Sequence, residues 1–416
     1  MKSLSELVSL SLGIVLLSLL SACSRQAETK SNQQTAKPRI ASPTAVFPKD
    51  DAIAYAVRFA DAMPRDEDGI QTQSKILEEV VQACLRRNES TRAAAIAGKI
   101  KGWQRGTAFA DIARHEALAG HTNEAARLIL LAEGWRAFMR EQTQDTNMGW
   151  TTGRIRDHLA SARAALGETE ESTALLQKPM FDVNARVVSQ WIAGVSHQTN
   201  AAFMQTLSVV LTNKDYAVQQ GLGLGMMAWA DRQKTLTPEA AKEIIAVVRA
   251  TLPMQPVQYQ LPVQAELVRF LQRLGRADET EEMSREFEMN ARSMSNGYYL
   301  STGLADAAVL LQQTNTNRAA NLIQEAESIA RQCTDASKSA ALSYVAERAA
   351  DMRQIEMAQR VYLDALAAAT VPPSAVPRLQ RLVETCASMG GAGVPLTPEI
   401  KNKLNELAAR EEGAKR

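Results

Sequence analysis

The sequence predicts an all-α protein, an α-solenoid of antiparallel helical hairpins that follows a signal peptide and a disordered tether. The 416 residues contain only 14 Pro and 21 Gly, which is few for an all-β chain with its many turns. Ala, Leu, Glu, Arg and Gln dominate, and these are strong helix formers. From residue 50 onward, apolar residues recur at the spacing of an amphipathic helix, and we expect no strand.

The first 22 residues predict an export signal. Lys2 and the terminal amine supply positive charge, and residues 7–20 form an apolar run of 14. That run is shorter than the roughly 20 residues that cross a membrane as a helix, and it matches the hydrophobic region of a secretory signal. The small residues Ser21 and Ala22 follow, and then Cys23.

The segment Leu20-Ser21-Ala22-Cys23 resembles the lipobox of bacterial lipoproteins. The resemblance implies cleavage between Ala22 and Cys23 and acylation of Cys23, with palmitate as a typical chain. It places the protein on the extracytoplasmic side of a cell membrane. Ser24 after the cysteine, where Asp would signal retention, implies the outer membrane, facing the periplasm, in a Gram-negative host. The alternative is an ordinary signal peptide with an incidental cysteine.

Residues 23–48 predict a flexible tether. They are polar, contain Pro38, Pro43 and Pro48, and show no helical or strand periodicity. Such a segment buries too little apolar area to offset its chain entropy. A coil of this length spans roughly 25–30 Å on average. The tether would therefore hold the folded body near the membrane that carries Cys23.

Residues 105–139 predict one helical hairpin, and residues 338–369 predict a second copy shifted by 233 residues. Gly120 is expected to end the first helix of the first copy. The small residues resemble those of the tetratricopeptide family, in a degenerate form: Ala113, Gly120, Ala125 and Ala132 in the first copy, and Ala346, Ala358 and Ala365 in the second, with Arg353 in place of Gly. The resemblance implies stacked hairpins that bind proteins.

The body is expected to divide into N-terminal repeats (residues 49–180), an irregular helical region (181–262) and C-terminal repeats (263–416). About 34 residues per unit predict seven to ten hairpins. Pro253, Pro256 and Pro262 are expected to break the chain and bend it between the two repeat halves.

Composition excludes several function classes. The 47 Lys and Arg nearly balance the 46 Asp and Glu, and no basic block is present, so we expect no nucleic-acid partner. Residues 221–225, Gly-Leu-Gly-Leu-Gly, lack the spacing and the preceding strand of a nucleotide loop. They are interpreted as a glycine-rich helix face or turn that allows close packing. We expect no cofactor.

Metal binding is not expected, because His115, His121, His158 and His197 show no ligand spacing. Beyond Cys23, the three cysteines Cys84, Cys333 and Cys386 permit one disulfide, or are buried thiols. The sequence does not decide between these alternatives.

An enzyme is not expected. Some lytic transglycosylases combine an α-superhelical domain with a lipid anchor, and they place a catalytic Glu before Ser, followed by Gly-Leu-Met-Gln. Glu-Ser pairs occur at residues 89–90, 171–172 and 327–328, but no Gly-Leu-Met-Gln follows any of them. We therefore assign no catalytic residue, and keep a cell-wall-active enzyme or a small-ligand groove as alternatives.

The dipeptide Gly-Trp occurs three times and supplies the candidate partner contacts Trp103, Trp135 and Trp150. They are either anchors of a partner-binding surface, where Trp is favoured, or plugs between successive hairpins. The sequence as a whole predicts a membrane-anchored lipoprotein that acts as a helical-repeat scaffold for protein–protein interaction in the bacterial cell envelope. A purely structural spacer is the remaining alternative.

Overall fold

The computed structural model describes residues 51–142, 149–176, 185–194, 214–233 and 236–413. The chain separates into two units, residues 1–42 and 43–416, and every described helix belongs to the second. The described residues form α-helices and one short 3-10 helix, with no strand among them, which confirms the all-α prediction. The expected signal peptide and tether, with Cys23, lie outside them. No described helix is long and apolar enough to cross a membrane.

The described helices form an inner and an outer layer. The inner helices are α2 (Glu67–Arg86), α4 (Gln104–Leu118), α6 (Gly149–Leu166), α8 (Ala185–Gly194), α10 (Tyr216–Asp231), α12 (Val257–Arg273), α14 (Gly297–Leu311), α16 (Asp335–Asp351) and α18 (Ala375–Gly391). The outer helices are α1 (Ala52–Asp61), α3 (Ser90–Ala97), α5 (Thr122–Gln142), α7 (Thr169–Leu176), α11 (Pro238–Thr251), α13 (Ala277–Arg292), α15 (Thr316–Gln332), α17 (Ile355–Ala369) and α19 (Pro398–Gly413).

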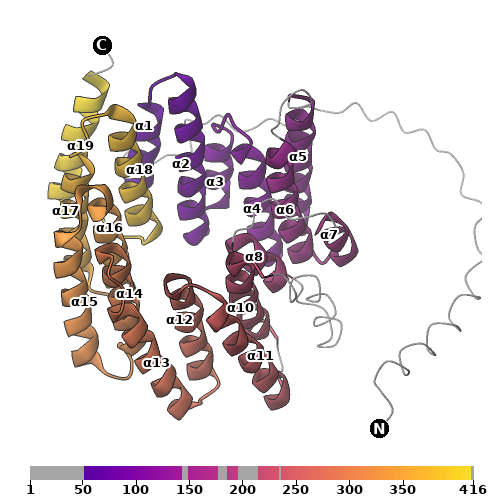
Figure 1. Cartoon of the computed structure of the whole chain (residues 1–416). Coiled ribbons are helices and arrows are strands. Elements are labelled where there is room, and N and C mark those ends of the chain that lie inside the picture. The colour runs from indigo at the N-terminus through magenta and orange to yellow at the C-terminus, as the bar shows by residue number, and fades with distance from the viewer. Residues whose placement is uncertain (1–50, 143–148, 177–184, 195–213, 234–235, 414–416) are drawn as a thin grey trace, which may run out of the picture. The chain divides into compact units, whose positions relative to one another are not determined.

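The inner helices of the second unit form a closed circle. Each packs against the next, from α2 through α18, and α18 then packs against α2 (Figure 1). Neighbouring inner helices run in the same direction: Gly221 and Gly225 of α10 lie against Val188 and Ile192 of α8, in the same order along both helices. The repeat array is therefore a ring whose inner helices all begin at one rim.

The first helix completes the last hairpin. Helix α18 makes its largest helix–helix interface with α1, and α1 occupies the outer position that the second helix of a hairpin takes elsewhere. On α19, Asn405 accepts a hydrogen bond from the Tyr55 hydroxyl of α1 at 2.7 Å. The Asp51 carboxylate caps α1 and pairs with Arg92 of α3 at 2.5 Å. Thus α1 joins the end of the ring to its beginning.

The two predicted copies of the repeat are hairpins of the ring, α4 with α5 and α16 with α17. The expected apolar stripe of the second helix is buried in both copies: Ala125, Leu128, Ile129 and Ala132 in α5, and Ala358, Val361, Tyr362 and Ala365 in α17. Small Ala side chains let paired helices approach toward the low end of the usual 8–10 Å separation. The helical-repeat prediction is confirmed.

A left-handed residue ends the first helix of most hairpins. Gly120 follows α4 with a φ of 84°, and Gly167, Gly275 and Gly393 follow α6, α12 and α18 in the same conformation. Arg353 follows α16 with a φ of 61°, at the position where the repeat pattern expects Gly. The Cβ of a non-glycine residue is strained in this region, so Arg353 carries a cost that the glycines avoid.

The Gly-Leu-Gly-Leu-Gly segment lies within α10 and allows close packing on two sides, as interpreted. A Cβ on Gly221 or Gly225 would lie 2.5 or 2.6 Å from the Cβ of Val188 or Ile192 on α8. On the other side, a Cβ on Gly223 would lie 2.9 Å from a Val263 methyl of α12.

The expected break at the three prolines is only partly right. Helix α11 ends at Thr251, and a short 3-10 helix, Leu252–Met254, with Pro256 separates it from α12. Pro262, however, lies inside α12, so the expected boundary between residues 262 and 263 falls within a helix. The apolar face of α12, buried at Leu261, Val263 and Leu267, carries the helix through the proline.

Candidate functional site

The inner layer carries two clusters of buried polar residues. The first, the acid–histidine cluster, contains Glu78 and Gln82 of α2, Thr107 and Asp111 of α4, His158 of α6 and Arg186 of α8. Four successive inner helices therefore contribute to it, although the residues are far apart in the sequence.

Asp111 is the centre of the acid–histidine cluster. Its carboxylate lies 2.7 Å from the Nδ1 of His158, accepts a hydrogen bond from Gln82 at 2.6 Å, and lies 3.3 Å from an Arg186 guanidinium nitrogen. Burial would raise its pKa, but the positive charges of His158 and Arg186 hold the pKa well below its usual range. Asp111 is therefore an ionised, fully engaged carboxylate.

Glu78 lies beside Asp111, but its pKa is shifted in the opposite direction. It accepts a hydrogen bond from the Thr107 hydroxyl at 2.9 Å and lies 4.0 Å from Arg186. Burial and the Asp111 charge raise the Glu78 pKa, although the His158 charge opposes them. His158 is only 2% exposed, so a substrate in solvent does not reach the Asp111–His158 pair, which suits a structural role.

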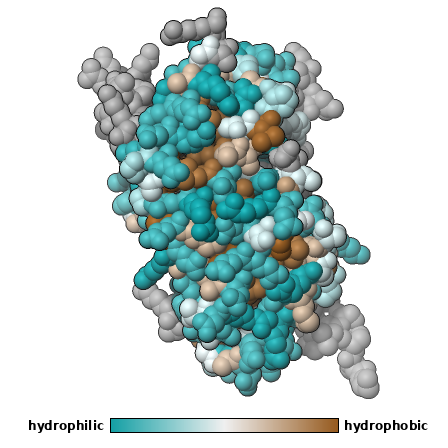
Figure 2. Space-filling model, turned by 90° about the vertical axis from the view of Figure 1, so that its left-hand side faces the viewer, coloured by the Kyte–Doolittle hydropathy of each residue, from teal (hydrophilic) through white to brown (hydrophobic). Residues whose placement is uncertain are grey.

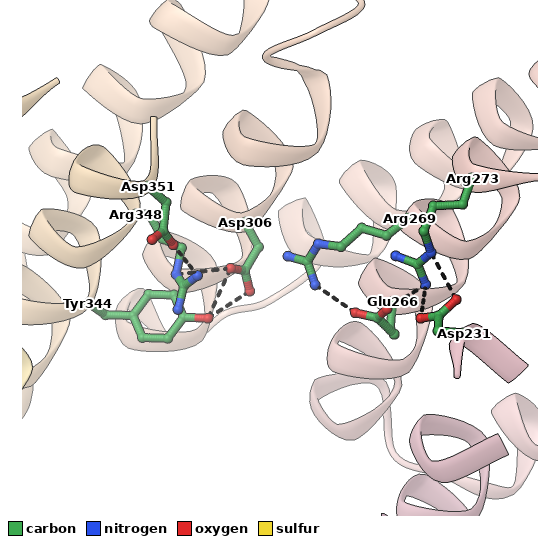
Figure 3. A network of polar contacts seen from close by, with 8 residues as sticks. All are labelled: Asp231, Glu266, Arg269, Arg273, Asp306, Tyr344, Arg348 and Asp351. Atoms are coloured by element: carbon green, nitrogen blue, oxygen red, sulfur yellow. Dashed lines mark hydrogen bonds and ion pairs between the residues drawn. The ribbon is translucent and has the colours of Figure 1, made fainter. Parts of the chain in front are cut away.

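The second cluster, the tyrosine–arginine cluster, joins α14 and α16 through Asp306, Tyr344, Arg348 and Asp351 (Figure 3), and Glu347 belongs to it as a partner of Arg348. The Tyr344 hydroxyl donates to both carboxylate oxygens of Asp306, at 2.9 and 2.8 Å. Arg348 donates to Asp351 at 2.5 Å and to Glu347 at 3.0 Å. Burial raises the pKa of Asp306 and, with the Asp306 charge, raises that of Tyr344.

Figure 3 also shows a second group of ion pairs, on α12 and α10, separate from the tyrosine–arginine cluster. Arg273 of α12 bridges Asp231 of α10 at 2.6 Å and Glu266 of its own helix at 3.0 Å, and Arg269 pairs with Glu266 at 3.0 Å. Exposed pairs of this kind contribute little individually. Only the Arg273–Asp231 pair joins two helices, α12 and α10, because both pairs of Glu266 lie within α12.

Glu79 and Glu384 lie on α2 and α18, the two inner helices whose packing closes the circle. Desolvation raises the pKa of Glu79 to about 7, and the Glu384 charge adds to this effect. Desolvation also raises the pKa of Glu384. Glu79 is nevertheless exposed to solvent. Accessible carboxylates with raised pKa values are the arrangement that a general acid requires.

Aromatic side chains gather at the rim where the inner helices begin. The members of this aromatic rim are Trp103 and Trp150, next to the starts of α4 and α6, and Tyr216, Tyr259, Tyr298 and Tyr299, in the first turns of α10, α12 and α14. Trp150, Tyr216 and Tyr299 are 37%, 40% and 38% exposed. Only 5% of the sequence is aromatic, so this concentration is local.

The predicted partner contacts all lie at or beside this rim. Trp103 and Trp150 pack edge to face with ring centroids 5.6 Å apart, and the Arg154 guanidinium lies 5.0 Å from both rings. Trp135 of α5 donates to the Gly102 carbonyl at 3.1 Å and stacks with Phe138, which is 45% exposed. Trp103 and Trp135 also pack partly against the core, as plugs would. Both interpretations of the Gly-Trp pairs therefore keep structural support.

The side of the ring where the outer helices α15, α17 and α19 lie is mostly polar. Figure 2 shows a mostly hydrophilic face on which apolar residues form small, separate patches. Scattered patches of this size are normal for a protein surface.

Three of the cysteines and three of the histidines lie in the described part of the chain. Cys84 and Cys386 are buried thiols and Cys333 is a half-buried one, with no disulfide among these three. Burial raises the Cys84 pKa to about 12, which keeps the thiol protonated. The described residues contain no group of His, Cys, Asp and Glu that could hold a metal ion. His197 lies outside the described residues.

The sequence did not indicate the two polar clusters, and of the aromatic rim it indicated only Trp103 and Trp150, through the Gly-Trp pairs. Each depends on which inner helices become neighbours, and residues such as Asp111 and His158 carry no motif.

These features define a class: a closed ring of helical hairpins with a polar inner wall. No protein-family model and no curated protein matches the chain. A solved structure described as a circular tandem repeat protein with novel repeat topology and enhanced subunit contact surfaces is similar at 15% identity, over 87% of this chain and 96% of that one, with a TM-score of 0.26. The fold assignment rests on the helix packing of this chain itself.

Proposed function

We propose that the protein is a lipid-anchored helical-repeat scaffold that binds a protein partner in the bacterial cell envelope. The aromatic rim is the observation that carries the binding part of this proposal. Trp, Tyr and Arg dominate the energetics of protein interfaces, and the rim presents the exposed rings of Trp150, Tyr216 and Tyr299 near the starts of three inner helices, with Arg154 beside Trp150. The anchoring part rests on the lipobox-like sequence that ends at Cys23.

A paired experiment tests the binding part. Cells expressing the full chain are crosslinked in the native envelope, and captured proteins are quantified by mass spectrometry. Trp150→Ala combined with Tyr299→Ala should reduce a reproducibly captured protein at least about tenfold, since two interface anchors are each worth more than about 1 kcal/mol. Ile355→Ala is the matched control, because Ile355 is 37% exposed but lies on the outer helix α17.

Equal capture by the wild type and the rim variant would contradict a partner at the rim. The anchoring part is tested separately by Cys23→Ala, which should leave an unprocessed or released protein without bound lipid. Normal processing and membrane retention of that variant would contradict the anchor without affecting the rim result.

A second candidate function is a cell-wall-active enzyme, favoured by the accessible carboxylates Glu79 and Glu384. A general acid with a pKa near 7 is suited to protonating a glycosidic oxygen. Glu79→Gln would abolish such an activity on peptidoglycan. No release of soluble fragments by the wild-type chain would leave the scaffold as the better account.

A further inference from the structure

The solvent-facing side of the outer helix α5 carries large apolar side chains. Leu130 is 67% exposed, the highest fraction among the large apolar residues that the structure describes, and Phe138 is 45% exposed. Gly134 lies between them, also exposed, and nothing lies within 4 Å of a Cβ built on it. The outer helix α13 instead presents charged residues such as Glu281 and Arg285 to solvent. An apolar face of this kind marks a contact surface.

This face is arranged symmetrically about Gly134. Four residues to either side stand the apolar Leu130 and Phe138, and seven residues to either side stand the opposite charges Arg127 and Glu141. At 3.6 residues per turn, all of them lie within about 40° of Gly134 around the helix. Arg127 donates to Glu124 at 2.7 Å, yet its side chain is 45% exposed. Glu141 is exposed as well and has no ion pair within the described part of the chain.

We propose that α5 is a contact between two copies of the chain, whose α5 helices pack antiparallel about a two-fold axis at Gly134. In this register each residue before Gly134 lies opposite the residue at the same distance after Gly134 in the second copy. Leu130 then packs on Phe138 of the second copy, and Arg127 meets Glu141 of the second copy. Each contact occurs twice, as in any two-fold interface. Gly134 lets the helix axes approach toward the low end of the usual 8–10 Å.

The order of charges favours a second copy over other occupants. An antiparallel copy places Arg127 opposite a carboxylate, whereas a parallel copy would place it opposite another Arg127. An anionic membrane surface attracts clusters of cations, but the charges of Arg127 and Glu141 on this face cancel. A single helix pair is at the low end of the roughly 1,200–2,000 Å² that stable interfaces bury, so the dimer should be weak. Helix α5 lies on the outside of the ring, where a second ring can reach it (Figure 1).

Cysteine crosslinking of the full chain tests the two-fold axis. Gly134→Cys places one thiol from each copy at the axis, within the roughly 4.4–6.8 Å between Cα atoms that a disulfide needs. Under mild oxidation it should form a product of twice the chain mass. The wild type should not form it, nor should Arg285→Cys, whose position on α13 is exposed to a similar degree. Absence of the dimer from Gly134→Cys, or a crosslink only to a different protein, overturns the proposal.

A charge exchange tests the register. In the Gly134→Cys background, Arg127→Glu or Glu141→Arg alone places like charges opposite each other and should lower the crosslink yield at least about threefold. The two changes together restore opposite charges and should restore the yield, which requires that the two residues face each other across two copies. Both positions are exposed, so unchanged melting temperatures show that folding is intact. A double variant as poor as the single ones overturns the register, whatever binds at the aromatic rim.

Discussion

Ile53 of α1 packs directly onto Gly390 of α18, and a Cβ on residue 390 would lie 2.5 Å from the Ile53 Cδ1 atom. The two residues come from opposite ends of the folded body. Their contact places the first helix in the outer position of the last hairpin, and Ile53 is fully buried there. The closure of the ring therefore depends on a glycine that leaves room for an isoleucine.

Gly390→Leu should expel α1 from its site. A leucine at this position overlaps Ile53 and cannot be relieved by a rotamer change, so we expect a loss of stability of about 3 kcal/mol. Hydrogen exchange should become fast in Ala52–Asp61 while α4 and α5 keep their protection. Gly134→Leu is the control, because nothing lies within 4 Å of a Cβ on Gly134. Unchanged exchange in α1 would show that closure does not need this contact.

Arg353→Gly should stabilise the protein by about 0.5–1 kcal/mol. Arg353 holds a φ of 61°, which costs an L-residue about 1–2 kcal/mol, partly offset by the greater freedom of glycine in the unfolded chain. The reverse change, Gly120→Arg, should destabilise by a similar amount, since Gly120 has a φ of 84°. Urea unfolding measures both. A destabilised Arg353→Gly would mean that the Arg353 side chain contributes more than its backbone strain costs.

Asp111→Ala should destabilise the protein by about 3–5 kcal/mol, because it leaves His158 and Arg186 without their carboxylate. The stability that Asp111 contributes should also depend on pH. Its folded-state pKa is lowered, so the contribution is present above the ordinary Asp pKa and is lost as the pH falls through the folded value. Chemical denaturation at several pH values measures this effect. An acid profile of Asp111→Ala that equals the wild-type profile would contradict the linkage.

Glu79 should give the opposite pH dependence. Its pKa rises from 4.5 to about 7 on folding, so the folded state binds a proton more tightly, and stability falls as the pH rises from about 4.5 to about 7. Glu79→Gln should remove this decline, since glutamine stays neutral. Melting temperatures between pH 4 and pH 8 provide the comparison. An identical slope in wild type and variant would show that Glu79 ionises normally.

The sequence predicted those features of the fold that depend only on residues close together in the chain. The stripe through Ala125, Leu128 and Ala132 and the stop at Gly120 are local signals, and the structure confirms both. Pro262 misled because tertiary packing of α12 outweighs a single missing amide. The ring closure could not be predicted, because nothing in the sequence of α1 or of α18 indicates that these two helices pack against each other. The Asp111–His158 pair could not be predicted either, because it needs the order of the inner helices.

The position of α1 also has a consequence for folding. Tyr55 and its partner Asn405 are 350 residues apart in the chain, so their contact has a very high sequence separation and a large loop-closure entropy. The hairpins can form from local contacts as the chain emerges, whereas α1 is synthesised among the first segments and finds its site only after α18 and α19 exist. Until then α1 can pack against α2, but the part of its surface that α18 covers has no partner, and a chaperone that covers residues 51–61 would protect the protein during this interval.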